Sequence, residues 1–460
     1  MADNFYKHIV CIGAGYVGGP TMAMIAAKCP QYKVTVVDIN AQRIKSWQGN
    51  ELPIYEPGLL DIVKKTRGRN LFFSTAVEEN IKAAEIIFVS INTPTKTYGS
   101  GAGKTADLQY WEKIAREISK VSESDKIIVE KSTLPVRTAE AMERILRVNN
   151  KKAHFEVLSN PEFLAEGTAI SDLENPDRVL IGARDTQSGQ KAMLEIVDIY
   201  KHWVSKDKIV TSDIWSSELS KLAANAFLAQ RISSINSISA LCEKTEADIT
   251  KVARAIGMDR RIGSNFLNAS IGFGGSCFKK DILNLVYICE YYSLYEVAQY
   301  WENVIKINEY QQTRFVKNMV NAMFNTLANK RITLFGFAFK ANTSDTRESP
   351  AIYISHKLAE EHSRIIVSDP KALDNAQYDL KGIADCVEFE LDPYKAARNA
   401  HAIAIITEWD IYKTLDYERI YQQMEKPAFI FDGRNILCHK KLYKIGFNVY
   451  PLGMPCMQHF

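Results

Sequence analysis

The chain has 460 residues, of which 46% are apolar and 24% charged, and its formal net charge is +3. This length predicts about two to three packed domains, and the composition is typical of a globular protein with a substantial core rather than a disordered chain. The small net charge and the lack of a long basic run exclude nucleic acid and anionic membranes as expected partners.

Two further observations set expectations about location and metals. The N-terminus enters a strand-like run at once, and no apolar stretch reaches ~18 residues, so we expect a cytoplasmic protein without a cleaved signal or membrane span. The eight cysteines and eight histidines are scattered. This spacing favours reduced thiols and predicts no metal site.

The first forty residues have the pattern of a dinucleotide-binding unit. HIVCIGAGYVGGPTMAMIAAK predicts a strand, a glycine turn and a helix, and VTVVDIN predicts a second strand that ends in an acid. Glycines allow a pyrophosphate to approach the backbone, and the acid accepts the ribose hydroxyls. The acid would also repel a 2′-phosphate, so NAD is favoured over NADP. The expected cofactor contacts here are Gly13, Gly15, Tyr16, Val17, Gly18, Asp38 and Arg43.

More strands follow at the spacing of an α/β domain, in EIIFVSINTPT, KIIVEKST and FEVLSNPEF. The stretch GSGAGKT at 99–105 resembles a phosphate-binding loop, but Tyr98 stands where that motif needs glycine and no strand precedes it. We interpret it as a flexible surface loop.

Past residue 212 the pattern changes. Residues 216–244 contain neither proline nor glycine and predict one long helix, of the kind that joins domains or forms a dimer seam. From about residue 331 a second strand and helix alternation begins. The predicted fold is therefore α/β, with two Rossmann-like doubly wound sheets joined by a central helical domain. We expect domains at 1–212, 213–325 and 326–460.

Seven stretches carry a family resemblance: GAGYVGGP, INTPTK, EKSTLPVRT, SNPEFLAEG, ELSKLAANAFLA, GFGGSCFKKD and FKANTSDTRESP. In this order they resemble the nucleotide-sugar dehydrogenases of the UDP-glucose/GDP-mannose dehydrogenase family, over nearly the whole chain. The resemblance is closest to members that act on UDP-glucose. It implies an NAD-binding first domain, a central domain with the nucleophile and a UDP-binding last domain.

Cys277 has the surroundings of a nucleophile. Glycines precede it, Lys280 follows, and ILNLVYICEYY predicts a helix that begins near the thiol. A helix N-terminus and a neighbouring ammonium both favour a thiolate. In an oxidation of an alcohol to a carboxylate, a thiolate can hold the intermediate aldehyde as a thiohemiacetal, which loses a second hydride to give a thioester.

The resemblance also implies partners for this cysteine. Glu218, Lys221 and Asn225 share one face of the predicted long helix, a pattern that by itself is typical of a solvated stripe. In the family the lysine and asparagine reach the active site, where the lysine stabilises an oxyanion. The remaining catalytic candidates implied are Asp281, Thr133 and Glu162.

The binding residues follow from the same resemblance. Further cofactor contacts are expected from Thr93, Thr95, Ser132, Thr133, Glu166, Lys280 and Arg347. Expected substrate contacts are Glu162, Phe163, Leu164, Glu166, Lys221, Asn225, Arg261, Asn268, Phe273, Gly274, Phe339, Lys340 and Arg434. Asn268 stands where some relatives carry lysine, and Lys279 replaces their glutamine or proline.

Several alternatives stay open at this point. UDP-N-acetylmannosamine or GDP-mannose dehydrogenases share the mechanism, and a catalytically silent NAD-binding regulator would share the fold. The long helix favours a homodimer, possibly three of which form a hexamer. Arg261 matches a family residue that enters the site of the neighbouring subunit.

Overall fold

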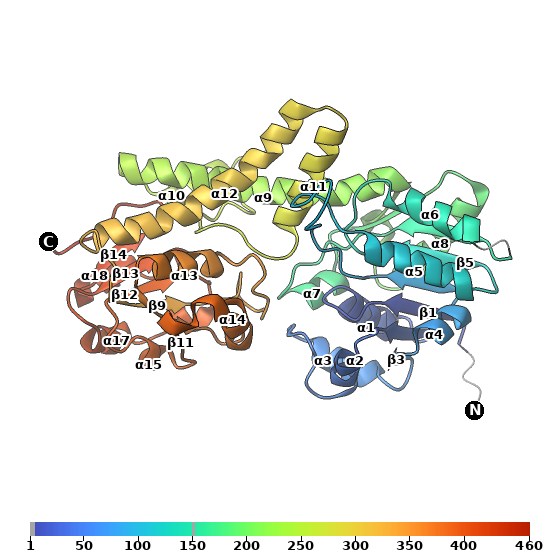
Figure 1. Ribbon diagram of the computed structural model, residues 1–460, viewed down its shortest axis with the longest axis horizontal. Coiled ribbons are helices and arrows are strands. Elements are labelled where there is room, and N and C mark those ends of the chain that lie inside the picture. Colours follow the sequence, from blue (N-terminus) through green and yellow to red (C-terminus); the bar gives the residue numbers. More distant parts are fainter. Residues whose placement is uncertain (1–4, 150–151) are drawn as a thin grey trace. The chain divides into compact units, whose positions relative to one another are not determined.

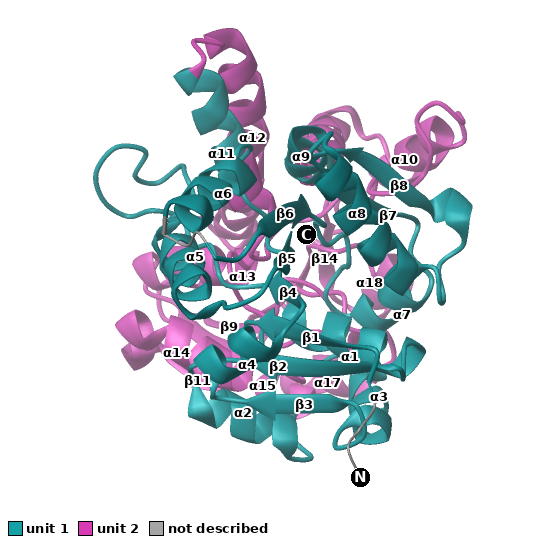
Figure 2. Ribbon diagram, turned by 90° about the vertical axis from the view of Figure 1, so that its right-hand side faces the viewer, with its two compact units in different colours: residues 1–224, 283–291 teal, residues 225–282, 292–460 magenta. Residues whose placement is uncertain are grey.

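The computed structural model describes residues 5–149 and 152–460, so residues 1–4 and 150–151 of the predicted 1–212 domain lie outside it. The chain divides into two compact units (Figure 2). The first holds residues 1–224 and 283–291, and the second holds residues 225–282 and 292–460. Two of the three boundaries, 224/225 and 282/283, therefore fall inside helices, and the third, 291/292, falls at the end of a helix.

The first unit contains an eight-stranded sheet in the order β3-β2-β1-β4-β5-β6-β7-β8. Neighbouring strands are parallel except β6 and β7, which are antiparallel. The strands are β1 (Lys7–Ile12), β2 (Tyr32–Val37), β3 (Leu71–Ser74), β4 (Ile86–Val89), β5 (Lys126–Glu130), β6 (Phe155–Ser159), β7 (Val179–Ala183) and β8 (Ile209–Asp213). The order reverses beside β1, which is the point where open parallel sheets bind ligands.

Helices cover both faces of this sheet (Figure 1). They are α1 (Gly18–Lys28), α2 (Ala41–Gln48), α3 (Leu59–Thr66), α4 (Val77–Ala83), α5 (Gln109–Val121), α6 (Thr138–Asn149), α7 (Ala169–Glu174) and α8 (Gln187–Tyr200), with a 3-10 turn η1 (Lys206–Lys208). Along β1, Ile9 and Cys11 join one apolar cluster, whereas Val10 and Ile12 join another. Side chains alternate along a strand, so both faces of β1 are buried.

The second unit contains a six-stranded, wholly parallel sheet in the order β11-β10-β9-β12-β13-β14. Its strands are β9 (Arg331–Phe335), β10 (Arg364–Ser368), β11 (Val387–Phe389), β12 (Ala402–Ile405), β13 (Phe429–Asp432) and β14 (Asn448–Pro451). The flanking helices are α13 (Pro350–Glu360), α14 (Leu373–Asp379), η2 (Lys381–Cys386), α15 (Pro393–Ala396), α16 (Asp410–Lys413), α17 (Tyr417–Gln423) and α18 (His439–Ile445).

Four further helices make up the middle of the chain: α9 (Ile214–Thr245), α10 (Ile249–Gly257), α11 (Phe278–Tyr291) and α12 (Tyr295–Ala322). The prediction of one long helix is confirmed, and α9 extends slightly beyond both predicted ends. The two sheets and the helical region confirm the predicted fold class. No helix within the described residues has the length and apolar character needed to cross a membrane.

The turn after β9 is hydrogen-bonded to a buried acid that follows the neighbouring strand. Asp369, which follows β10, is fully buried. Its Oδ2 accepts the amides of Phe337 at 2.7 Å and Ala338 at 3.1 Å and the indole N–H of Trp409 at 3.1 Å. The Asp369 carboxylate therefore holds the backbone of this turn in place.

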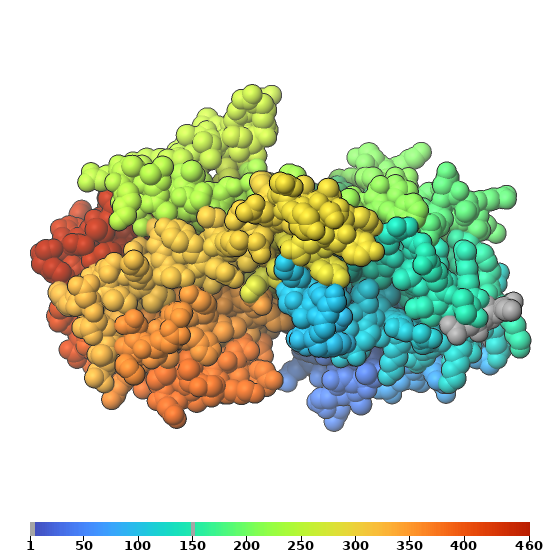
Figure 3. All heavy atoms as spheres, turned by 45° about the horizontal axis from the view of Figure 1, so that its top comes forward, coloured from blue at the N-terminus to red at the C-terminus, as the bar shows by residue number. Residues whose placement is uncertain are grey.

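The segment 99–105 is a loop, as interpreted, but it is fastened at several points. Its flanks Thr95 and Ala106 form an antiparallel bridge. Lys104 pairs with Glu290 at 2.5 Å, and the Ala106 amide donates to Asn284 at 2.7 Å. In Figure 3 the blue spheres of this loop lie against the yellow spheres of the α11 region. The expected flexibility is thus opposed by contacts that the sequence pattern did not indicate.

Candidate active site

The glycine turn between β1 and α1 is tight on one side and open on the other. Gly13 has φ +107°, and a Cβ there would lie 2.2 Å from the carbonyl oxygen of Ser90. A Cβ on Gly18 would lie 2.1 Å from the Gly13 oxygen, whereas one on Gly15 meets nothing described within 4 Å. Residues 16–17 complete the turn at the N-terminus of α1. An open backbone at a helix N-terminus fits a pyrophosphate.

Asp38 lies directly after β2 and next to this turn. Its Oδ2 accepts the Ala14 amide at 3.1 Å, and its Oδ1 accepts the Asn40 amide at 2.9 Å. Arg43 donates to the same carboxylate at 3.0 Å and is itself 44% exposed. The acid is therefore held where a ribose would bind, and the turn and the acid together fit NAD.

The loops after β4 and β5 are fastened to each other at the carboxyl edge of the first sheet. Thr93 Oγ1 donates to the Thr133 carbonyl at 3.2 Å, and Ser132 Oγ donates to the Ile91 carbonyl at 2.7 Å. Thr95 lies two residues beyond Thr93. Four residues predicted from separate motifs therefore come together at one sheet edge.

The NPEFLAEG segment after β6 forms a folded loop at the same edge. Glu162 Oε1 accepts the amides of Phe163 at 2.8 Å and Leu164 at 3.0 Å. The Phe163 ring contacts the ammonium of Lys221, 5.1 Å from the ring centroid. Glu166 is half-buried further along the loop. The first unit thus brings five of the predicted substrate contacts onto one loop and the adjoining start of α9.

The face of α9 that carries Glu218, Lys221 and Asn225 is buried, which corrects the reading of a solvated stripe. Glu218 accepts the backbone amides of Arg137 at 2.6 Å and Ala139 at 2.9 Å, at the start of α6. Its neighbour Glu130 ends β5. Burial, and then the charge of Glu218, raise the pKa of Glu130 well above its ordinary value, and burial also raises that of Glu218. Burial thus favours the protonated form of both acids.

The GFGG loop in the second unit has glycines where larger residues would collide. Gly272 has φ +119°, and a Cβ there would lie 2.7 Å from the Asn308 Oδ1. A Cβ on Gly274 would lie 2.5 Å from the carbonyl oxygen of Glu348 and 2.9 Å from the Phe339 Cβ. The Asn308 side chain accepts the Phe273 amide at 2.8 Å and donates to its carbonyl at 3.1 Å. This loop is therefore packed closely on its neighbours.

Cys277 immediately precedes α11, as predicted. Its thiol is half-buried and lies 3.5 Å from the Ser276 hydroxyl. The carbonyl of Cys277 accepts the Asp281 amide at 2.8 Å, which closes the first helical turn. The Asp281 carboxylate is fully buried and accepts the Asn225 side-chain amide at 2.6 Å. The structure thus brings three predicted catalytic residues of the second unit together.

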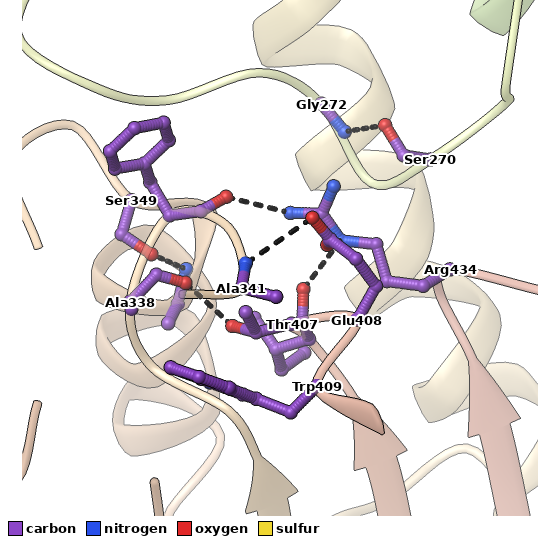
Figure 4. Close-up of polar contacts among 12 residues, drawn as sticks. Ser270, Gly272, Ala338, Ala341, Ser349, Thr407, Glu408, Trp409 and Arg434 are labelled. Carbon is purple, nitrogen blue, oxygen red and sulfur yellow. Dashed lines mark hydrogen bonds and ion pairs between the residues drawn. The ribbon is translucent and has the colours of Figure 1, made fainter. Parts of the chain in front are cut away.

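A second group of predicted residues lies at the strand ends of the second sheet (Figure 4). Arg434, which follows β13, donates to the carbonyls of Ile406 at 2.6 Å and Phe339 at 3.1 Å and pairs with Glu408 at 3.3 Å. The Lys340 ammonium lies 5.7 Å from the centroid of the Phe339 ring. The Arg434 guanidinium is therefore fixed rather than solvated.

The other predicted contacts are more exposed. Arg347 pairs with Asp345 at 2.5 Å and is 47% exposed, while the Lys280 side chain is 17% exposed in the first turn of α11. Arg261 pairs with Asp259 at 2.6 Å and is 88% exposed. Asn268 is exposed as well. The structure does not join Arg261 or Asn268 to the group around Cys277.

Three buried polar residues near these groups were missed. Lys131 pairs with Glu162, Asn308 brackets Phe273, and Glu56 accepts the amides of Gly167 and Ala169. The sequence offers little signal for them, because such side chains are usually exposed and only the tertiary fold buries them.

Comparisons with known proteins agree with this geometry. Three models of the UDP-glucose/GDP-mannose dehydrogenase family match the chain: the NAD binding domain over residues 7–251, the central domain over 215–310 and the UDP binding domain over 333–439. The chain belongs to this family. The match to its first model makes NAD the cofactor, and the match to its last model marks a UDP-binding domain.

Individual relatives are similar over almost the full length. The chain is 59% identical to UDP-glucose 6-dehydrogenase 3 of Oryza sativa subsp. japonica and 56% identical to UDP-glucose 6-dehydrogenase 1 of Arabidopsis thaliana, in both cases over 97% of each chain. Among solved structures it resembles a UDP-glucose dehydrogenase from the archaeon Pyrobaculum islandicum, with a TM-score of 0.86 and 30% identity over 99% of both chains. A UDP-D-ManNAc dehydrogenase from Pyrococcus horikoshii shares the fold, with a TM-score of 0.81 at 22% identity over 97% of this chain and 99% of that one.

Proposed function

We propose that this family member oxidises UDP-glucose to UDP-glucuronate by removing two hydrides from the same carbon. The observation that carries the proposal is the Cys277 thiol at the start of α11, in a close-packed glycine loop and four residues before the Asp281–Asn225 hydrogen bond. The UDP-glucose 6-dehydrogenase relatives at 56–59% identity support the same substrate.

Each residue has a definite role in this proposal. NAD, when bound, accepts the hydrides. The Cys277 thiolate adds to the C6 aldehyde left by the first oxidation and forms a thiohemiacetal, and loss of the second hydride leaves a thioester. Water then cleaves the C–S bond, which releases the carboxylate and returns the thiolate.

The polar residues handle charge and water. Lys221 stabilises the negative charge that develops on the C6 oxygen. Asp281, held by Asn225, orients water and carries its proton, and Thr133 positions that water. Glu162 is a candidate acid or base from the family resemblance.

The binding residues separate into two sets. The glycine turn with Asp38, Thr93, Thr95, Ser132, Glu166, Lys280 and Arg347 would hold NAD. The UDP-sugar would contact Phe163, Leu164, Asn268, Phe273, Gly274, Phe339, Lys340 and Arg434. We assign these tasks to domains at 1–212, 213–325 and 326–460, in a cytoplasmic homodimer or hexamer in which Arg261 contacts the neighbour's substrate.

Absorbance of NADH tests the proposal. The protein is mixed with NAD and, separately, UDP-glucose, UDP-N-acetylmannosamine or GDP-mannose. We expect two NADH for each UDP-glucose and far less from the other sugars. A preference for either rival sugar would reassign the substrate, and no NADH with any sugar would favour a silent NAD-binding regulator.

A further inference from the structure

A buried lysine lies beside the predicted catalytic loop of the first unit. Lys131 directly follows β5, and its side chain is only 3% exposed. Its ammonium lies 2.9 Å from the Glu162 carboxylate, 3.1 Å from Asn160 Oδ1 and 3.2 Å from the Tyr200 hydroxyl. An ammonium has three donors, so these contacts use its full capacity, as a charge removed from water requires.

The partners of Lys131 are themselves fixed. The Tyr200 hydroxyl donates to Asn160 Oδ1 at 2.7 Å, and the Asn160 amide donates to the Leu180 carbonyl of β7 at 2.8 Å. Glu162 and Lys131 therefore meet in a closed polar network with little freedom to rearrange.

Most of the hydrogen-bonding capacity of the Glu162 carboxylate is already used within the protein. Its Oε1 accepts two backbone amides, and its Oε2 meets Lys131 and the Thr21 hydroxyl at 3.4 Å. Burial alone would raise the pKa of this carboxyl, but the Lys131 charge and the hydrogen bonds outweigh burial and lower it. Glu162 is thus held as a carboxylate and is poorly suited to donate a proton.

The same loop reaches Lys221. The Phe163 amide donates to Glu162. The Lys221 ammonium lies 5.1 Å, and the Arg178 guanidinium 3.8 Å, from the centroid of the Phe163 ring. A cation over an aromatic face is attracted to it, so the place of this ring constrains the place of the ammonium.

We propose that Lys131 is a positioning residue for Lys221: through the Glu162 carboxylate it fixes the 162–164 loop, and through Phe163 it fixes the ammonium. Glu162 then serves as a charged anchor and not as the acid of the reaction. The proposal rests on the proposed function only in giving Lys221 a part in catalysis.

The decisive variants remove one or both charges. Lys131→Met leaves Glu162 buried without its cation, so we expect kcat to fall by about 100-fold near pH 8 with KM for both substrates changed less than about threefold. This fall in kcat should become smaller as pH falls, because protonation of Glu162 removes the unpaired buried charge. The double variant Lys131→Met/Glu162→Gln should recover about tenfold in kcat and lose this pH dependence, because its amide resembles the protonated acid.

Lys126→Met is the matched control. Lys126 begins the same strand, is equally buried and donates to the carbonyls of Lys82 at 2.9 Å and Ala84 at 2.5 Å, not to a carboxylate. It should lower the thermal midpoint and leave kcat and its pH profile unchanged. If Lys131→Met unfolds, the double variant decides, since it contains no unpaired buried charge.

Thermal unfolding at several pH values supplies a readout that needs no substrate. In Lys131→Met, burial without the cation should raise the pKa of Glu162. This variant should therefore lose stability as pH rises through that pKa, and the double variant should not. The unfolding measurement tests the proposal even if UDP-glucose is not the substrate. A Lys131→Met kcat within about twofold of wild type, or an equal loss at all pH values that Glu162→Gln does not relieve, would overturn the proposal.

Discussion

Asn225 donates its side-chain amide to the buried Asp281 carboxylate at 2.6 Å, so α9 is hydrogen-bonded to the first turn of α11. A hydrogen bond to a charged group contributes about 1.5–3 kcal/mol. This bond ties a residue of the longest helix to the turn that follows the Cys277 thiol.

Asn225→Ala should therefore lower both the thermal midpoint and kcat. Asn225→Asp should do worse near neutral pH, because it brings two carboxylates together, and should improve as pH falls and the pair takes up a proton. Steady-state kinetics and unfolding curves between about pH 5 and 8 would show both effects. Gln230→Ala, which removes a 2.8 Å contact to Ser234 on the same helix, is the control. Equal behaviour of the two Asn225 variants at all pH values would contradict this view.

Asp38 should determine the preference for NAD. Replacing it with Ser removes the acceptor for the ribose hydroxyls and frees Arg43, now 3.0 Å away, to meet a 2′-phosphate. We expect the ratio of kcat/KM for NAD to that for NADP to fall by about 100-fold, two favourable contacts being worth roughly 3 kcal/mol. Adding Arg43→Ala should remove the gain with NADP. Equal use of both cofactors by the wild type would show that Asp38 has another role.

The raised pKa values of the buried acids Glu130 and Glu218 should make stability depend on pH. The pKa of Glu130 is raised above its ordinary value of 4.5. Its favourable contribution is thus complete below that value and is lost as pH rises through the higher pKa of the folded state. Glu130→Gln should flatten the fall in thermal midpoint at alkaline pH. Glu123→Gln, which alters an exposed acid 2.8 Å from Lys82, should leave that slope unchanged.

Cys277→Ser should abolish turnover while ligand binding survives. Serine is nearly isosteric but far less acidic, so the covalent step should slow by a thousandfold or more, on the order of 4 kcal/mol in the barrier. Calorimetry with NAD and UDP-glucose, together with NADH production, separates binding from chemistry. Cys438→Ser, at an exposed thiol, should behave as wild type. Near-normal acid formation by Cys277→Ala would rule out the covalent mechanism.

Arg261 should complete the substrate site of a neighbouring subunit. Its side chain is 88% exposed and pairs with Asp259, two positions away, so it is open to a contact with another chain. Arg261→Ala and Cys277→Ala chains should each be nearly inactive, and a mixture should regain about a quarter of wild-type activity once subunits exchange, if sites combine at random in dimers. No recovery after exchange has been demonstrated by mass spectrometry would refute this assignment.

The sequence predicts the parts of this fold that have strong local patterns. The glycine turn, the strands before Thr93 and Thr133, and α9 all stand where expected. The short strands β7, β11 and β14 were missed, because three to five residues are too few to show a period and only their sheet neighbours define them.

In the candidate site, too, the residues predicted from sequence are those with a strong local pattern. Cys277 and the glycines are recognisable because their chemistry needs those residue types in that order. Lys131 and Glu218 are charged residues whose burial depends on partners far away in sequence, 31 positions for the first and 79–81 for the second. Local reading assigns such residues to the solvent.

The turn after β9, which is hydrogen-bonded to Asp369, bears on the order of the two oxidation steps. Asp369 follows β10 as Asp38 follows β2, and its Oδ2 accepts two amides of the turn after β9 and the Trp409 indole, whereas Asp38 accepts one amide, that of Ala14, from the turn after β1. This turn also lies in the part of the chain that matches the family's UDP binding domain, whereas the NAD binding domain covers the first sheet. A four-electron oxidation must therefore draw on two cofactor molecules in succession at the first sheet. The spent cofactor has to leave and a fresh one arrive while the half-oxidised sugar is still tethered. Hydride transfer therefore alternates with replacement of NADH by NAD. The bond between Cys277 and the sugar must last longer than that replacement takes.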